Sequence, residues 1–121
     1  MILTVTKKFE FHYAHYLPGY NGPCSKVHGH TGVLEVEVCG EGRVKASYEG
    51  MVMDFGDLKR IVQEEVIRWL DHEFINNYIT VPTAENMCEW IWKRLEERFG
   101  EGLVRVRVYE TPTSWAEIRR K

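Results

Sequence analysis

Apolar and polar residues alternate in two stretches of the chain, as expected for β-strands with one buried and one solvated face. Residues 31–39 alternate aliphatic side chains with glutamates, and residues 103–109 alternate them with arginines. The inward positions are Leu34, Val36 and Val38 in the first stretch and Val104, Val106 and Val108 in the second. We predict a further strand at residues 2–12 and a short one at residues 51–53, after the turn residue Gly50.

Two longer stretches have apolar residues at the spacing of a helix that buries one face. The first follows Asp54, a favourable N-cap residue, and runs to about Leu70. The second follows Thr83, also a favourable N-cap residue, and ends near Gly100. The apolar stripes are Phe55, Leu58, Ile61, Val62, Val66 and Trp69 in the first, and Ala84, Met87, Cys88, Ile91, Trp92 and Leu95 in the second.

This order of elements, three strands, two helices and a last strand, predicts an α+β fold with both helices on one face of an antiparallel sheet. The other face would carry Glu35, Glu37, Arg105 and Arg107, so water or a partner subunit would have to cover it. The chain has 121 residues, enough to bury a core, and we expect a single domain over residues 1–121.

The composition is that of an ordinary soluble protein, with 44% hydrophobic and 28% charged residues and a formal net charge of −2. Bulk charge gives no sign of a nucleic-acid partner. No apolar run has membrane-spanning length and no signal peptide is recognisable, so we expect a cytoplasmic protein without a membrane partner. The cysteines are too few, and odd in number, for a disulfide framework; they are Cys24, Cys39 and Cys88.

The histidines suggest a metal site. His28 and His30 are two residues apart, so in an extended chain both rings point to the same side. His15 lies across a loop rich in Gly and Pro that could fold back on them, although spacing alone does not exclude His12 instead. Three histidines with an open fourth position are typical of catalytic zinc, while iron and copper also accept imidazole. The alternative is a chance group of surface histidines.

Cys24 and the pair Asp71-His72 are candidates for acid–base chemistry. Cys24 lies four residues before His28 and near Lys26, and nearby cations lower the pKa of a thiol. Cys24 could instead be a fourth zinc ligand. A carboxylate can fix the tautomer of an imidazole, so Asp71-His72 could act on other groups, including Cys24. The alternative for His72 is a favourable charge at the C-terminal end of the first helix.

Glu110 continues the inward face of the last predicted strand. A carboxylate at the end of a buried face is costly unless it is paired. A ligand with two parallel donors, such as the guanidine-like edge of a pterin or guanine, would satisfy it. The alternatives are that the strand has already ended or that Glu110 pairs with an arginine.

Six short motifs, taken together and in order, resemble the 6-pyruvoyl-tetrahydropterin synthase family, most closely its 6-carboxy-tetrahydropterin synthase branch in queuosine biosynthesis. The similarity covers nearly the whole chain. One departure is Tyr13, at a position where a small residue is more usual. The motifs are Phe11-His12-Tyr13-Ala14-His15, Cys24-x-x-x-His28-Gly29-His30, Asp54-Phe55-Gly56-Asp57-Leu58-Lys59, Leu70-Asp71-His72, Pro82-Thr83-Ala84-Glu85-Asn86 and Glu110-Thr111.

The resemblance implies the tunnelling fold, a four-stranded antiparallel sheet with two helices on one face. Such subunits assemble through their sheets into trimers, and two trimers stack into a homohexamer with active sites between subunits. A partner subunit would then cover the second face of the sheet.

The resemblance also implies a lyase reaction on 7,8-dihydroneopterin triphosphate, which yields 6-carboxy-5,6,7,8-tetrahydropterin, acetaldehyde and triphosphate. A zinc ion would polarise the reacting oxygens. Its ligands would be His15, His28 and His30. Proton transfer would fall to Cys24, Asp71 and His72, and the pterin edge would be held by Glu110 and Thr111.

The carboxy branch is favoured by the three-residue spacer between Cys24 and His28 and by the sequence from Glu110 to Glu117. Two alternatives use the same residues: a 6-pyruvoyl-tetrahydropterin synthase, which eliminates triphosphate, and a related pterin aldolase. A third is a non-catalytic zinc-binding module with a closed metal.

Overall fold

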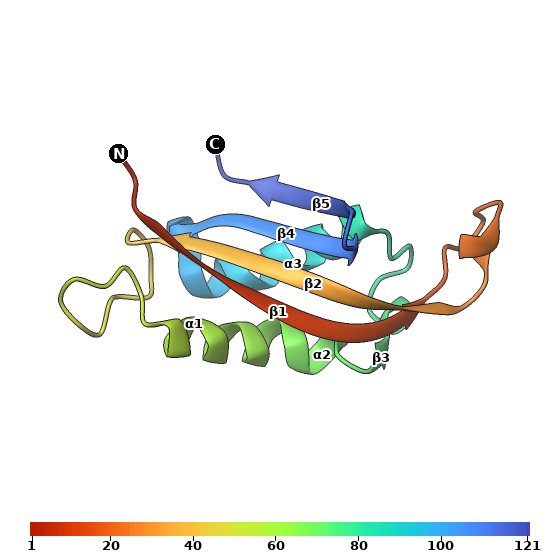
Figure 1. Ribbon diagram of the computed structural model, residues 1–121, viewed down its shortest axis with the longest axis horizontal. Helices are drawn as coiled ribbons and strands as arrows, with labels where there is room; N and C mark the ends of the chain where they lie inside the picture. Colours follow the sequence, from red (N-terminus) through yellow and green to blue (C-terminus); the bar gives the residue numbers. More distant parts are fainter.

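One sheet of five strands forms a layer, and the helices cover one of its faces (Figure 1). The computed structural model describes residues 1–121. The strand order is β3-β1-β2-β4-β5, and neighbours are antiparallel except β3, which pairs with β1 in parallel. The strands are β1 (Thr4–His15), β2 (His28–Cys39), β3 (Glu73–Phe74), β4 (Leu103–Thr111) and β5 (Ser114–Arg119).

The helical layer has two long segments, each with the predicted N-cap. Asp54 accepts a hydrogen bond from the amide of Gly56, and Thr83 accepts one from the amide of Asn86. The first segment reaches Leu70, as predicted, but contains a π-helical turn in its middle. The segments comprise α1 (Phe55–Val62), the π-helical η2 (Gln63–Ile67) and α2 (Arg68–Leu70), followed later by α3 (Ala84–Phe99). Short 3-10 turns occupy η1 (Pro23–Ser25), η3 (Ile75–Asn77) and η4 (Gly100–Gly102).

The core lies between the inner face of the sheet and the apolar stripes of the helices, except that Phe55 and Trp69 of the first predicted stripe are exposed. Val106 and Val108 are fully buried there, as the alternation predicts, and Cys88 is also buried. Val104 was predicted to face inward but is only half-buried. The ladder between β2 and β4 shifts register beside Glu37 and Val38, so that Leu103 rather than Val104 enters the core.

Three details of the predicted sheet are wrong. The sheet has five strands rather than four, because β5 folds back on β4 after a tight turn and β3 adds two residues beside β1. Residues 51–53 form bends rather than a strand. Of the three, only Met53 is buried, and it packs in the core. The paired strands also extend further toward the loop between them than predicted: β1 continues to His15 instead of ending at residue 12, and β2 begins at His28 instead of residue 31, which places the candidate metal ligands inside the ladder.

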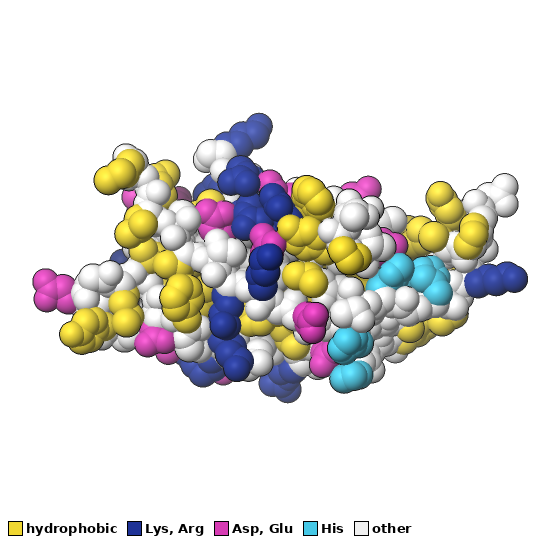
Figure 2. Space-filling view, in the orientation of Figure 1, with side chains coloured by type: hydrophobic (Ala, Val, Ile, Leu, Met, Phe, Trp, Pro, Cys, Tyr) yellow, Lys and Arg dark blue, Asp and Glu magenta, His cyan; other side chains and the backbone are white.

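The outer face of the sheet carries a band of charged side chains (Figure 2). Arg105 is only 7% exposed and Glu35 only 6%, so these side chains cover one another. The Arg105 Nε lies 2.7 Å from an oxygen of Glu37, and its NH1 lies 3.0 Å from one of Glu35. Burial alone would raise the pKa of Glu35, but hydrogen bonds from Tyr109 and Arg105 outweigh it and lower that pKa.

No helix of this chain combines the length and the apolar composition needed to cross a membrane.

Candidate functional site

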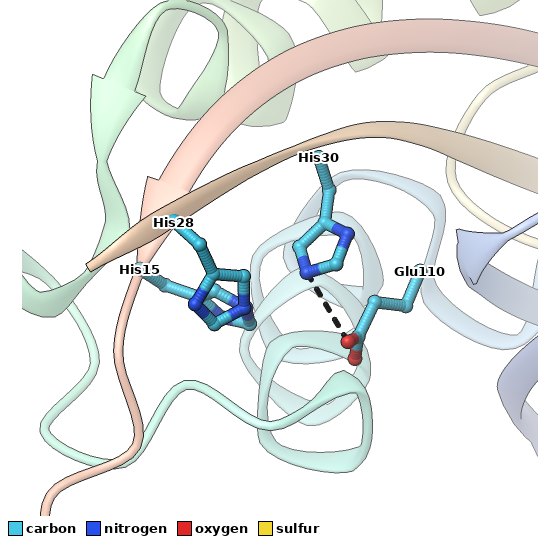
Figure 3. A group of neighbouring side chains, drawn as sticks. All are labelled: His15, His28, His30 and Glu110. Carbon is cyan, nitrogen blue, oxygen red and sulfur yellow. Dashed lines mark hydrogen bonds and ion pairs between the residues drawn. The ribbon is translucent and has the colours of Figure 1, made fainter. Parts of the chain in front are cut away.

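The last residues of β1 and the first residues of β2 bring the three predicted metal ligands together. His15 pairs directly with His28, and His30 pairs with Tyr13 two positions further along the ladder. Because side chains alternate between faces, these residues lie on the same face as Phe11 and Leu34. The apolar rows of the core therefore continue into a group of polar side chains, shown in Figure 3. His12 points to the other face, which removes it as the rival of His15.

Four side chains could hold a metal ion here. The metal-binding atoms of His15, His28, His30 and Glu110 all lie within 4.8 Å of one another. The two Nε2 atoms of His15 and His28 are 3.1 Å apart. His30 Nε2 lies 3.2 Å from a carboxylate oxygen of Glu110.

Backbone carbonyls fix the tautomers of two of these rings. His15 Nδ1 donates to the carbonyl of Pro82 at 2.8 Å, and His28 Nδ1 donates to the carbonyl of Lys26 at 2.7 Å. With the proton on Nδ1, each Nε2 of a neutral ring presents a lone pair. Two lone pairs that face each other at this distance repel unless a cation lies beside them. Histidines that bind a metal through one ring nitrogen usually donate the proton of the other to a carbonyl in this way.

The electrostatics of the group favour the neutral, metal-binding form of the rings. Burial lowers the pKa of His15, and the neighbouring His28 and His30 lower it further, although the Pro82 carbonyl opposes this. Burial also lowers the pKa of His30, against the charge of Glu110. His30 Nε2 is buried and, despite its short distance to Glu110, makes no hydrogen bond of good geometry. Three neutral imidazoles and a carboxylate suit a zinc ion.

Tyr13 forms one wall of the group. Its ring lies edge-on to that of His15 at 5.2 Å between centroids, and 5.6 Å from that of His30. The side chain is buried and its hydroxyl has no hydrogen-bond partner. Burial, together with the charge of Glu110, raises the pKa of Tyr13, so the phenol remains protonated.

A cavity of about 620 Å³ opens where β2 and β4 separate. The predicted substrate residues Glu110 and Thr111 line it together with His30, so it reaches the candidate metal group from outside. A larger hollow of about 800 Å³ at the end of α3 contains no histidine or cysteine. Its arginines instead bind carbonyls of the helix end.

The predicted pair Asp71-His72 lies on the opposite face of β1. The amide of His12 donates to the Asp71 carboxylate at 2.9 Å, and the amide of His72 donates to the carbonyl of His12 at 2.6 Å. The helical segment ends at Leu70 with Asp71 in an extended conformation, and His72 in the turn that follows is left-handed, with φ 60°. Its exposed ring stacks on that of His12, 5.6 Å between centroids, and His12 bonds to Thr31 on β2. Within one chain this pair is therefore separated from the three histidines by the sheet.

Cys24 lies in η1, on the loop that joins the histidine-bearing ends of β1 and β2. It is half-buried, and its carbonyl accepts a hydrogen bond from the amide of Leu17. Its thiol is not part of the four-residue group and makes no hydrogen bond to Asp71 or His72. Its catalytic role stays a prediction, as do those of Asp71 and His72.

Comparisons with known proteins identify the family of this chain. The family model described as 6-pyruvoyl tetrahydropterin synthase matches residues 4–121. The chain belongs to this enzyme family. A protein of Archaeoglobus fulgidus, whose name assigns it provisionally to 6-carboxy-5,6,7,8-tetrahydropterin synthase, is 47% identical over 120 residues, 99% of this chain and 96% of its own. The Haemophilus influenzae protein of that name is 33% identical over 95% of this chain and 97% of its own.

A solved structure shares the architecture. The 6-pyruvoyl tetrahydropterin synthase of Caenorhabditis elegans superposes with a TM-score of 0.84 and 25% identity, over 100% of this chain and 97% of its own. The family and the tunnelling-fold architecture that the motifs suggested are thus confirmed, apart from the number of strands.

Sequence reasoning missed the partners that orient the ligands. The carbonyls of Pro82 and Lys26 carry no side-chain signal, so only the folded backbone reveals them. Tyr13 was noted as a departure from the family pattern, but its place beside the metal group was not foreseen. The period of two in β1, from Phe9 through Phe11 and Tyr13 to His15, could have revealed it.

Proposed function

We propose that this protein converts 7,8-dihydroneopterin triphosphate to 6-carboxy-5,6,7,8-tetrahydropterin, with release of acetaldehyde and triphosphate, in a zinc-dependent reaction. The observation that carries this proposal is the convergence of three histidines, two of them with fixed tautomers, and Glu110 beside an open cavity. The names of the two relatives and the three-residue spacer after Cys24 support the carboxy reaction. Queuosine biosynthesis is then the expected pathway, and the cytoplasm the expected location.

His15, His28 and His30 would hold the zinc ion, and the cavity beside His30 would leave one side of it accessible to substrate. A zinc ion in such a site acts as a Lewis acid that polarises bound oxygens. Glu110 would accept hydrogen bonds from the pterin edge, with Thr111 beside it. In this arrangement Glu110 would turn from His30 toward the ligand, and His30 Nε2 would turn to the metal.

Proton transfer is assigned to Cys24 and to the pair Asp71-His72. Since the latter lies on the other side of the sheet from the histidines, one chain does not assemble the whole set. A second copy that presents its Asp71-His72 to the first chain's cavity would complete it. The homohexamer with sites between subunits, implied by the family resemblance, would meet this requirement, and the partly unpaired edges of β1 and β5 offer surfaces for such assembly.

The decisive experiment is to incubate the zinc-loaded protein with 7,8-dihydroneopterin triphosphate and to identify the products by mass spectrometry. We expect 6-carboxy-5,6,7,8-tetrahydropterin and acetaldehyde. The variant His28→Ala, treated in the same way, should give neither. A pyruvoyl product would retain the residue roles but assign the sister reaction. No conversion by a folded, zinc-loaded protein would reject the proposal.

A further inference from the structure

The ring of Tyr13 occupies a space that a missing side chain provides. Gly32 on β2 lies opposite Phe11, and a Cβ atom placed on it would come within 3.0 Å of the rings of both Phe11 and Tyr13. The two rings stack at 5.2 Å between centroids. Tyr13 therefore lies across β2 above Gly32, and a side chain at position 32 would force the two rings to shift by a few tenths of an ångström.

In this orientation the Tyr13 hydroxyl points toward β4. The ladder between β2 and β4 ends at the pair Val33–Tyr109, so Glu110 is the first residue of β4 beyond it, at the end where Gly32 follows on β2. The charge of Glu110 is one of the influences on Tyr13, which agrees with this placement. The hydroxyl nevertheless forms no hydrogen bond to Glu110 or to any other group of the chain.

Unpaired buried polar atoms are concentrated at this site. The whole chain has three buried side-chain nitrogen or oxygen atoms without a hydrogen bond, and two of them are Tyr13 Oη and His30 Nε2. The third, NH1 of Arg105, lies in the ion-pair network of the outer face. A buried hydroxyl without a hydrogen-bond partner destabilises the folded state. His30 lines the cavity, and the ring of Tyr13 lies behind it, against the rings of His15 and His30. Two such atoms in one group indicate a ligand that enters past His30 and satisfies them both.

We propose that Tyr13 is a substrate-binding residue whose hydroxyl donates a hydrogen bond to an oxygen of the ligand held against His15, His28 and His30. The inference rests on the proposed function for the identity of that ligand, a pterin with an oxygen-bearing side chain. It goes beyond that function because it gives the phenol of Tyr13 a role as a hydrogen-bond donor in the site. The hydroxyl keeps its proton at neutral pH, since an ordinary phenol has a pKa of about 10. Because the side chain is buried, only a ligand bound at the three histidines can accept its hydrogen bond.

The test compares Tyr13→Phe with the matched control Tyr48→Phe, which removes the same atom from an exposed side chain. The first measurement is the urea unfolding midpoint of the metal-free proteins. Because the hydroxyl has no partner in the chain, Tyr13→Phe should unfold at the same urea concentration as the wild type or a higher one. A midpoint clearly lower than that of Tyr48→Phe would overturn the proposal, since it would reveal a partner within the protein.

The second measurement uses a probe that is independent of pterins. The cobalt-loaded proteins are titrated with acetohydroxamate, a small oxygen ligand of metals with an open position, and binding is followed in the visible spectrum. Loss of one hydrogen bond should weaken binding about fivefold to tenfold in Tyr13→Phe, with no change in Tyr48→Phe. Equal binding by all proteins, or failure of cobalt to bind the wild type, would overturn the proposal.

Turnover separates this inference from the proposed function. If the wild type does not convert 7,8-dihydroneopterin triphosphate while Tyr13→Phe still weakens the hydroxamate complex, the proposed function fails and the role of Tyr13 stands. If the wild type converts it and Tyr13→Phe binds hydroxamate and substrate as tightly as the wild type, only the role of Tyr13 fails. If the hydroxyl binds the substrate, the KM of Tyr13→Phe should exceed that of the wild type by more than the KM of Tyr48→Phe does.

Discussion

His15 and His28 face each other with their Nε2 atoms 3.1 Å apart, and each ring donates its other nitrogen's proton to a backbone carbonyl. This relationship is unfavourable for two neutral rings alone, because two lone pairs meet. It is favourable around a cation, which both lone pairs can bind. The carbonyls of Pro82 and Lys26 thus prepare the pair for a metal before any metal arrives.

Metal content should therefore depend on His15 and not on its sequence neighbour His12. We expect His15→Ala to retain less than about a tenth of the wild-type zinc after dialysis against a weak chelator, because loss of one of three ligands removes most of the affinity. The matched variant His12→Ala should retain zinc near one ion per chain. Elemental analysis by mass spectrometry measures both. Equal zinc in the two variants would mean that the metal lies elsewhere.

Metal binding should also survive moderate acidification. Burial lowers the pKa of His15 and His30, so the folded protein keeps these rings neutral below the ordinary histidine value of about 6.5. The unfolded chain binds protons there and the folded one does not, so stability of the metal-free protein should fall as the pH drops below about 6.5. Zinc affinity should begin to fall only at a lower pH than for a hexahistidine peptide. Competition with a chelator from pH 5 to 8 tests this order.

Much of the fold follows from local pattern, and the failures have physical causes. Both helices and their caps were predictable because Asp54 and Thr83 use their own side chains. Val104 was misplaced because a register shift in the ladder is a tertiary feature with no local signature. The separation of Asp71-His72 from the three histidines was equally invisible, because it depends on which face of β1 meets the chain after α2.

The three cysteines should differ in reactivity. Burial raises the pKa of Cys88 to about 11, and its thiol lies 3.3 Å from the carbonyl of Val106, so almost no thiolate forms at neutral pH. Cys24 and Cys39 are half-buried. We expect iodoacetamide at pH 7.5 to modify these two in the native protein and Cys88 only after unfolding. Peptide mass spectrometry distinguishes the sites, and early modification of Cys88 would contradict its place in the core.

Arg105 should be essential for the outer face of the sheet. Its removal leaves Glu35 and Glu37 without their main partner, and breaking a largely buried ion pair costs on the order of 3 kcal/mol. We expect Arg105→Ala to lower the free energy of unfolding by about that amount in urea titrations. Lys8→Ala serves as the control, because Lys8 also contacts Glu35 but is 71% exposed, and it should cost less than about 0.5 kcal/mol.

The same network has a defined pH dependence. Burial alone would raise the pKa of Glu35 and of Glu37, but hydrogen bonds from Arg105 and other partners lower both. Stability from these carboxylates is therefore present above the ordinary Glu pKa and is lost as the pH falls through the lowered values. The wild type should lose stability as the pH falls below about 4.5, where Arg105→Ala should change less. Parallel acid titrations with the same slope would show that the network is not the cause.

The π-helical turn η2 should depend on Arg94. A π turn leaves backbone carbonyls without their usual helical partners; the Glu65 carbonyl accepts from Arg94 Nε at 2.6 Å, and the Glu64 carbonyl accepts from Trp69 Nε1 at 3.2 Å. The Arg94 guanidinium also lies between the rings of Trp69 and Trp90, 5.0 and 4.8 Å from their centroids. Arg94→Met keeps an unbranched apolar stem but loses the guanidinium donor, and we expect a loss of about 1–3 kcal/mol in the free energy of unfolding.

The neighbouring variant Lys93→Met is the control for this change, because Lys93 is exposed and bonds only to Glu89. If Arg94 holds the π turn in place, Arg94→Met should also speed hydrogen exchange of the amides of α2 and of Asp71, which lie directly after the turn. Lys93→Met should leave exchange there unchanged. The π turn determines the direction in which the helical segment leads into Asp71-His72. Faster exchange should therefore be accompanied by a shift of the His72 ring resonances in NMR spectra. Unchanged exchange and resonances in a destabilised Arg94→Met would mean that Arg94 stabilises the helix layer without positioning this pair.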